Sequence, residues 1–126
     1  MSKAIIISMT KEGCYPLIDG VKSVFYRNHK FKNDFEKIYF YEPLPAGKIV
    51  GEADIDTIII SDKDSIWEDT AENFVISKAS FFEFLKDKSN ATAVKIKNAK
   101  RYEKSREISE FGKNLIPPQR FLYLDY

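Results

Sequence analysis

The sequence contains only one cysteine, Cys14, and one histidine, His29. A lone thiol cannot form an intramolecular disulfide, so we expect a protein of a reducing, cytoplasmic compartment. The two residues do not have the spacing of metal ligands, and we therefore expect no metal site. His29 lies in a polar loop among lysines, which is typical of an exposed side chain rather than of a Ser-His-Asp or Cys-His catalytic device.

Glycines and long apolar runs are also scarce. The five glycines are scattered, so the sequence has neither a phosphate-binding loop nor a dinucleotide fingerprint, and we expect no cofactor. No apolar run approaches the roughly 20 residues that span a bilayer. The chain starts with a strand-like segment instead of a signal-type hydrophobic stretch, so we expect no membrane partner.

The composition is that of a folded domain, with 44% hydrophobic and 31% charged residues. The 126 residues fit a single domain spanning residues 1–126, and a domain near this size buries roughly two thirds of its unfolded surface. Such a chain can form a core without metals or disulfides.

Charge is unevenly distributed although the net charge is only +1. The segment from Glu52 to Glu72 contains eight acidic residues and only one basic residue, Lys63. A later run is basic and is broken only by Glu103; it contains Lys95, Lys97, Lys100, Arg101, Lys104 and Arg106. Both runs fit solvated edges of strands and helices, and the basic run also fits a face that follows a phosphate backbone.

Apolar, β-branched and aromatic runs predict a sheet, and the continuous run Ile5 to Ile7 indicates that the first strand lies inside it. After Lys48, small or apolar residues alternate with mostly acidic ones, which predicts a strand with one small or apolar face and one acidic face. Gly51 is expected to mark a bend in this strand or a close approach to it. The basic run is predicted to continue as an extended edge or loop. The expected strands are Lys3 to Met9, Lys22 to Asn28, Lys37 to Tyr41, a strand from Lys48 that Ile58 to Ile60 extends or re-enters, Thr92 to Asn98, and Arg120 to Tyr123.

Three short helices are expected beside the sheet. The first ends at Asp19-Gly20 and starts irregularly near Gly13 or is very short, because Pro16 is tolerated only in a first turn. The second starts with Ser65 as the cap and Glu68 completing a capping box. The third starts at Ser77 and buries a stripe of Phe81, Phe84 and Leu85. The pattern predicts an α+β domain with a curled, mixed, barrel-like sheet.

The segment from Gly20 to Arg27 is the best candidate for a ligand site, together with Ser8 after the first strand and Glu52 on the fourth. Lys22 and Arg27 are five residues apart on one short strand, so they face opposite sides unless the strand bulges or bends. The alternative is that both side chains are solvated at an edge of the sheet.

In this order of features the sequence resembles the ASCH domain family of the PUA-like superfamily. The matching features run over nearly the whole chain: the strand ending in Ser8, Gly20-x-Lys22 with Arg27 downstream, Ile49-Val50-Gly51-Glu52, Ile66-Trp67, Ile76-Ser77 with Phe81, and Pro117-Pro118-Gln119-Arg120-Phe121. The resemblance implies a PUA-like curled mixed β-barrel with short flanking helices and a cleft between barrel and helices. It also implies an RNA- or nucleotide-binding module whose cleft is lined by Lys22 and Arg27, with Ser8, Tyr26, Glu52 and Gln119 as further wall residues.

Some small ASCH proteins resemble amidohydrolases of acylated cytidine nucleosides, with a lysine, a threonine three residues later and a glutamate near the middle helices. Here Lys22 occupies the lysine position, but Phe25 occupies the threonine position and cannot be a nucleophile or relay a proton. Glu72 lies close to the glutamate position, and Glu72 or Glu52 is the substitute base that this alternative requires.

Three functions therefore remain open. The leading hypothesis is an RNA- or nucleotide-binding module in which an arginine recognises phosphate or base edges, a lysine supplies charge and Tyr26 stacks a base. The second is a small hydrolase or nuclease in which Lys22 activates a nucleophile and Glu52 or Glu72 moves protons. The third is a protein-interaction domain. The ligand, pathway and oligomeric state are not predicted.

Overall fold

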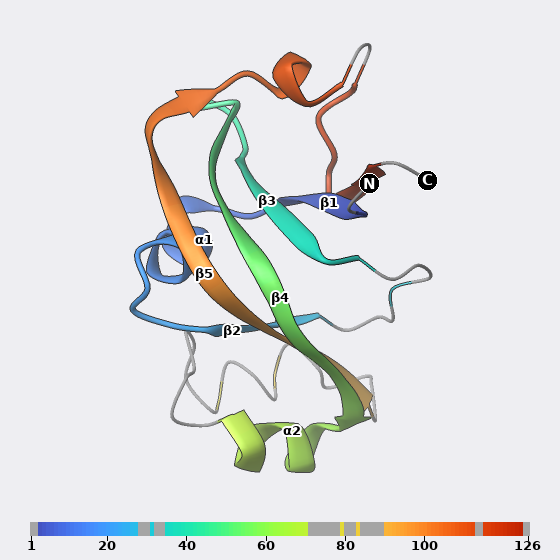
Figure 1. The fold of residues 1–126 in the computed structure, drawn as a ribbon. Coiled ribbons are helices and arrows are strands. Elements are labelled where there is room, and N and C mark those ends of the chain that lie inside the picture. The colour runs from blue at the N-terminus through green and yellow to red at the C-terminus, as the bar shows by residue number, and fades with distance from the viewer. Residues whose placement is uncertain are drawn as a thin grey trace.

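The computed structural model describes residues 3–27, 31, 35–70, 79, 83, 90–112 and 115–124, and these form a six-stranded sheet with short helices at its sides (Figure 1). The sheet order is β2-β5-β4-β3-β1-β6, with β1 and β3 parallel, so the predicted mixed sheet with the first strand inside it is confirmed. The strands are β1 (Ala4–Ser8), β2 (Val24–Arg27), β3 (Lys37–Glu42), β4 (Lys48–Asp62), β5 (Asn90–Arg106) and β6 (Phe121–Leu124).

The long pair β4 and β5 curls the sheet. The two strands pair from Ile49 and Arg106 at one end to Asp62 and Asn90 at the other, with three register shifts, two with the extra residues on β5 and one with an extra residue on β4. Each such bulge bends the strand and increases its twist. The predicted strand from Lys48 and the segment Ile58 to Ile60 are therefore one bulged strand, and the basic run continues as an extended strand through Arg106.

Alternating side chains of the strands divide the core between the two faces of the sheet. Inside the curl, Ile5, Ile7 and Phe40 pack against Leu17 and Ile18 of helix α1 (Lys11–Ile18). The neighbouring residues in each strand point the other way, and a second cluster contains Ile6, Tyr41, Ile49 and Tyr102. A third cluster joins Val24, Tyr26, Ala91 and Ala93 to Ile66 of helix α2 (Lys63–Thr70).

Helix α1 starts earlier than its proline suggests. It begins at Lys11 and contains Pro16, so the expected start near Gly13 is wrong. Pro16 lacks one backbone donor, yet the helix ends two residues later, so little of the hydrogen-bond ladder is lost. Gly20 has φ +79°, a left-handed conformation, and ends the helix as predicted.

Helix α2 is capped by Asp62 and not by Ser65. The Asp62 Oδ1 accepts the Ser65 backbone N–H at 2.9 Å, and Oδ2 accepts the Ser65 hydroxyl at 2.9 Å. An aspartate satisfies an orphan amide of a first turn as well as a serine does, so the helix starts at Lys63, two residues before the predicted cap. No helix in the described part of the chain is long and apolar enough to cross a membrane.

Apart from residues 79 and 83, which are helical, the third predicted helix lies outside the described residues, as do Glu72 and His29. The residues outside the described ranges include the expected cap, Ser77, and the predicted buried stripe of Phe81, Phe84 and Leu85. These expectations stay predictions.

Gly51 generates a stability prediction. A Cβ at this position would lie 2.6 Å from the Lys100 carbonyl oxygen and 2.8 Å from Ile18 Cγ2, so Gly51→Ala must separate β4 from β5 or from α1. We expect a loss of about 2 kcal/mol in the free energy of unfolding, the typical cost of overpacking, measured by urea denaturation.

Gly20→Ala is the matched control, because nothing lies within 4 Å of its added Cβ and the cost comes only from the positive φ. It should lose about 1 kcal/mol. Equal losses in the two variants, or a Gly51→Ala as stable as wild type, would show that the close approach does not constrain the sheet.

Candidate nucleic-acid interface

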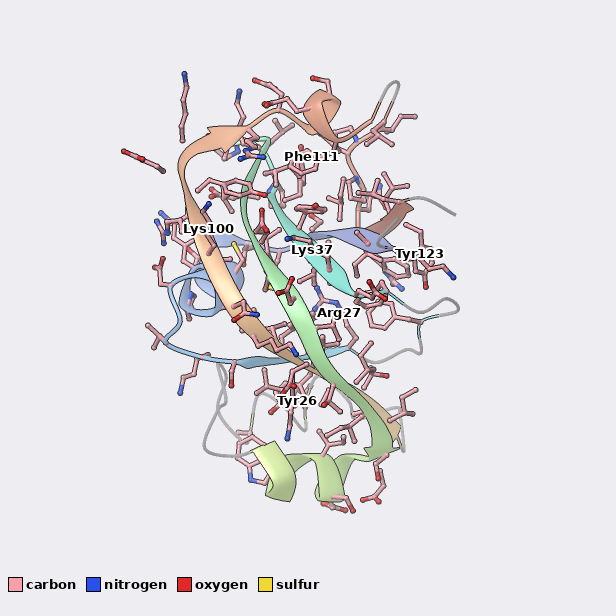
Figure 2. The ribbon with its side chains drawn as sticks, viewed as in Figure 1. Tyr26, Arg27, Lys37, Lys100, Phe111 and Tyr123 are labelled. Carbon is pink, nitrogen blue, oxygen red and sulfur yellow. The ribbon has the colours of Figure 1, made fainter. Side chains whose placement is uncertain are left out.

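Arg27 is the last residue of β2 and lies on the inner side of the curled sheet. It shares a strand face with Phe25, which packs in the inner core against Phe40. The Arg27 Cζ lies 5.3 Å from the Phe25 ring centroid, and Nη1 donates a hydrogen bond to the Tyr26 carbonyl oxygen at 3.2 Å. Figure 2 shows Arg27 between β2 and β1. In the described part of the chain no carboxylate pairs with it.

The electrostatic environment of Arg27 is unfavourable for a cation. Burial lowers the pKa of its guanidinium to about 10, and the positive charge of Arg120 contributes in the same direction. A charged group that leaves water without a partner costs free energy. An anion placed between two arginines would remove this cost, so the arrangement favours binding of negative charge.

Several predicted wall residues lie at this end of the sheet. The Ser8 backbone N–H donates to the Arg120 carbonyl oxygen at 2.7 Å, which holds the end of β1 against the residue before β6. Gln119 is exposed and adjoins Arg120 in the chain. The structure therefore brings Ser8 and Gln119 to Arg120, whose charge acts on Arg27. Arg120 was missed as a site residue, although it lies in the Pro-Pro-Gln-Arg-Phe motif.

Aromatic rings continue this end of the molecule along β6. The Phe31 and Phe121 ring centroids are 5.1 Å apart, and those of Phe121 and Tyr123 are 5.3 Å apart, both with edge-to-face geometry. All three rings are partly buried and pack against the inner core. Figure 2 shows Tyr123 at the edge formed by β6.

Lys22 lies in the turn before β2, at the opposite end of that strand from Arg27. Its backbone N–H donates to the Pro16 carbonyl oxygen at 3.0 Å, and its side chain is partly exposed. The residues of β2 pair with β5 in an uninterrupted register, so the bulge that would turn Lys22 toward Arg27 is absent from β2. The three residue steps from Val24 to Arg27 alone span about 10 Å of extended strand.

Tyr26 does not line the same space as Arg27. Adjacent strand residues point to opposite faces, and Tyr26 packs with Ile66 and Ala93 beneath α2. Its side chain is only 5% exposed. The expectation that Tyr26 stacks a base is corrected, because the ring belongs to the core.

Glu52 lies on the outer face of β4, away from Arg27. Its carboxylate is 2.5 Å from the Lys37 ammonium and accepts a hydrogen bond from the Tyr102 hydroxyl at 2.8 Å. Burial alone would raise the pKa of Glu52, but the hydrogen bonds from Lys37 and Tyr102 outweigh it and lower that pKa below its ordinary value. The structure therefore does not bring Glu52 to Lys22 or Arg27, and the carboxylate holds the outer face together.

The first half of the basic run lies beside acidic residues of β4 and of the end of α1. Lys100 lies opposite Glu52 in the β4–β5 register, and Lys97 lies opposite Asp54. Arg101 is bonded to Asp19 through two hydrogen bonds of 2.7 Å. These pairings favour the solvated-edge interpretation for this part of the run. No group of three or more His, Cys, Asp or Glu side chains that could hold a metal occurs within the described ranges.

Comparison with solved structures defines the class of this fold. ASCH from Zymomonas mobilis superimposes with a TM-score of 0.84 at 20% identity, covering 96% of this chain and 87% of that chain. The N-terminal domain of Staphylothermus marinus McrB gives a TM-score of 0.53 at 12% identity, covering 86% and 77%. The chain therefore has the fold of the ASCH domain.

Sequence comparison gives the family. Residues 3–114 match the family described as "Domain of unknown function (DUF365)", and the chain belongs to that family. Among curated proteins, the large ribosomal subunit protein uL22 of Ureaplasma parvum is 28% identical over 98% of this chain, and the ATP synthase subunit alpha of the same species is 28% identical over 97%. The chain spans 40% of the first relative's length and 15% of the second's.

The ion pair between Glu52 and Lys37 predicts that the stability of the fold depends on pH. The pKa of Glu52 is lowered in the folded state, so its contribution is complete above the unfolded pKa and is lost as pH falls through the folded pKa. Glu52→Gln should therefore be less stable than wild type near neutral pH, and the difference should shrink below about pH 4.5, which chemical denaturation across pH 3 to 7 measures.

Tyr102→Phe provides the control, since it removes one hydrogen bond to Glu52 but keeps the carboxylate. It should retain part of the pH dependence. A stability difference between Glu52→Gln and wild type that is the same at pH 3 and pH 7 would contradict the assigned role of the carboxylate.

Proposed function

We propose that this domain binds RNA or a nucleotide and that Arg27 is its anion anchor. The observation that supports the proposal is a guanidinium whose pKa is lowered by burial and by the charge of Arg120, and which has no carboxylate partner among the described residues. Arginines retained for stability are normally paired when they leave water. Arg27 instead donates a hydrogen bond to the Tyr26 carbonyl oxygen and has further N–H groups that can bind a ligand.

The chemistry around Arg27 suits a phosphate attached to a base. A guanidinium presents several N–H groups in one plane and can bind phosphate through two parallel hydrogen bonds. Ser8 and Gln119 supply further hydrogen-bonding groups near Arg120, and the aromatic rings of β6 adjoin them. Aromatic rings beside cations are the usual components of single-stranded nucleic-acid sites.

The matches to curated proteins support a domain that occurs within proteins of different names. Nearly all of this chain matches within a ribosomal protein and also within an ATP synthase subunit, and it makes up less than half of each. Two hosts with different names share the segment, so we infer that it contributes a binding function separate from the activity of its host. The ribosomal relative is the one that suggests RNA.

Lys22 remains a proposed ligand residue on the resemblance to ASCH domains. Its position at the far end of β2 means that it would contact a different part of an extended ligand from Arg27. The hydrolase alternative loses one of its two bases, because Glu52 is bonded to Lys37 and Tyr102 on the outer face. Binding without turnover is therefore the function we propose.

Replacing Arg27 tests the proposal. Arg27→Met keeps an apolar stem against Phe25 and removes the charge, so affinity for a fluorescein-labelled 12-nucleotide RNA should fall roughly 10- to 100-fold, the loss expected for charge-assisted hydrogen bonds. Thermal unfolding of the variant should be unchanged or improved, because a desolvated cation has been removed. Fluorescence anisotropy and differential scanning fluorimetry provide the two measurements.

Lys97→Met is the matched control, since it removes an exposed cation on β5 that lies opposite Asp54. Its RNA affinity should stay within about threefold of wild type, and wild-type affinity should fall as salt rises. The proposal fails if wild-type protein binds neither RNA nor nucleotides, or if Arg27→Met unfolds at a lower temperature and binds as well as wild type. Turnover of acylated nucleosides by wild-type protein would establish the hydrolase instead.

A further inference from the structure

Two neighbouring hollows lie beside the end of β5 that extends toward Arg106. The first has a volume of about 330 Å³ and is formed by α1, β3, β4 and β5. The second has a volume of about 480 Å³ and is formed by β5 and the segment that follows it. Tyr102 and Ser105 line both hollows, so these two residues form their common wall. Neither hollow is lined by Arg27, Arg120 or Ser8.

The first hollow contains a fixed guanidinium plane. The Arg101 Cζ lies 3.9 Å from the centroid of the Tyr15 ring, and Asp19 accepts two hydrogen bonds from the same guanidinium. The Tyr15 hydroxyl donates to the Glu42 carboxylate, which is partly buried and lines the hollow. Arg101 is therefore held in one orientation beside a carboxylate acceptor.

This arrangement suits a planar ring with N–H groups. A guanidinium already stacked on an aromatic ring provides a flat surface on which a base can stack. The Glu42 carboxylate can accept N–H donors at the edge of that base, and the Ser105 hydroxyl can donate or accept. The volume lies at the small end of ligand pockets, which suits one base and not a larger ligand.

The second hollow carries the charge that a phosphate requires. The Arg106 Cζ lies 4.3 Å from the Tyr102 ring centroid, and among the described residues no carboxylate pairs with its guanidinium. Lys100 and Lys104 line the same hollow. Figure 2 shows Lys100 on the same arm of β5. Two carboxylates, Glu103 and Glu110, are also present, so cations outnumber acids by three to two.

We propose that the two hollows form a second binding site for one nucleotide, with the base on Arg101 beside Glu42 and the phosphate on Arg106 and Lys104. The base and the phosphate of a nucleotide are covalently linked. Both hollows border Tyr102 and Ser105, so a nucleotide that reaches across these two residues can occupy both. An acidic peptide has no planar ring with N–H groups to offer the Arg101 plane and the Glu42 carboxylate of the first hollow. The site shares no residue with the Arg27 region and does not rest on the function proposed for it.

Binding of the four ribonucleoside 5′-monophosphates to the full chain tests this site. Titration followed by amide ¹H–¹⁵N spectra should shift resonances of residues 100–106 and of Tyr15, and Arg106→Met should weaken the tightest nucleotide at least about tenfold. Glu42→Gln should change the ranking of the four nucleotides, because it alters which base edges can be accepted. Arg27→Met should leave these shifts in place.

Two controls keep the test decisive. Lys97→Met removes a cation of the same strand outside both hollows and should leave the affinity for nucleotides unchanged. Ser105→Trp places a bulky side chain between the two hollows, where it should block the ligand. It should abolish the shifts even if Arg106→Met proves unstable. Inorganic phosphate that binds as tightly as the nucleotides, a tetraglutamate peptide that binds as tightly, or shifts confined to residues around Arg27 would each overturn the proposal.

Discussion

The bulged antiparallel pair β4 and β5 is the constraint on which the rest of the structure depends. Gly51 lets the two strands and α1 approach within distances that no side chain would allow, and three register shifts turn a long ladder into a twisted arm. One end of β5 carries β2 and thus sets the position of Arg27. The other end pairs with the start of β4 and lines both hollows.

The molecule uses its charges in two ways. On the outer face of β4, Glu52 is matched by Lys37, and at the end of α1 Asp19 is matched by Arg101, so these charges hold elements together. Arg27 is desolvated but has no carboxylate partner in the described part of the chain. The positive charge of Arg120 makes its charged form still less favourable. Because no carboxylate among the described residues balances this guanidinium, an anion bound beside it would lower the free energy.

Local patterns predicted most of the sheet. The apolar run of β1, the aromatic run of β3 and the glycine after α1 specify their own conformations, because burial and backbone preference act over a few residues. The predicted cap of α2 was three residues too late because two nearby polar residues, Asp62 and Ser65, can each cap a helix. The length of β4 was not predicted, because its bulges depend on β5, which lies far along the chain.

The candidate site was predictable only in part. The sequence singled out Arg27 as a chemical group, but its desolvation arises from strand pairing between distant segments. Strand alternation could have excluded Tyr26, since it adjoins Arg27 and must face the opposite side. Arg120 carried a usable signal, an arginine directly before the last strand, but its approach to Arg27 depends on the position of β6 beside β1. Glu52 was a reasonable candidate that turned out to be paired on the outer face.

The central claim is that the Arg27 guanidinium contacts the ligand. The most direct measurement is the arginine side-chain Nε–Hε spectrum of the ¹⁵N-labelled protein, with the Arg27 resonance assigned by its loss in Arg27→Lys, recorded before and after addition of a short RNA. The account predicts that the Arg27 resonance shifts strongly and exchanges more slowly with water once a phosphate is bound. An Arg27 resonance that stays in place while the RNA saturates the protein would contradict the account.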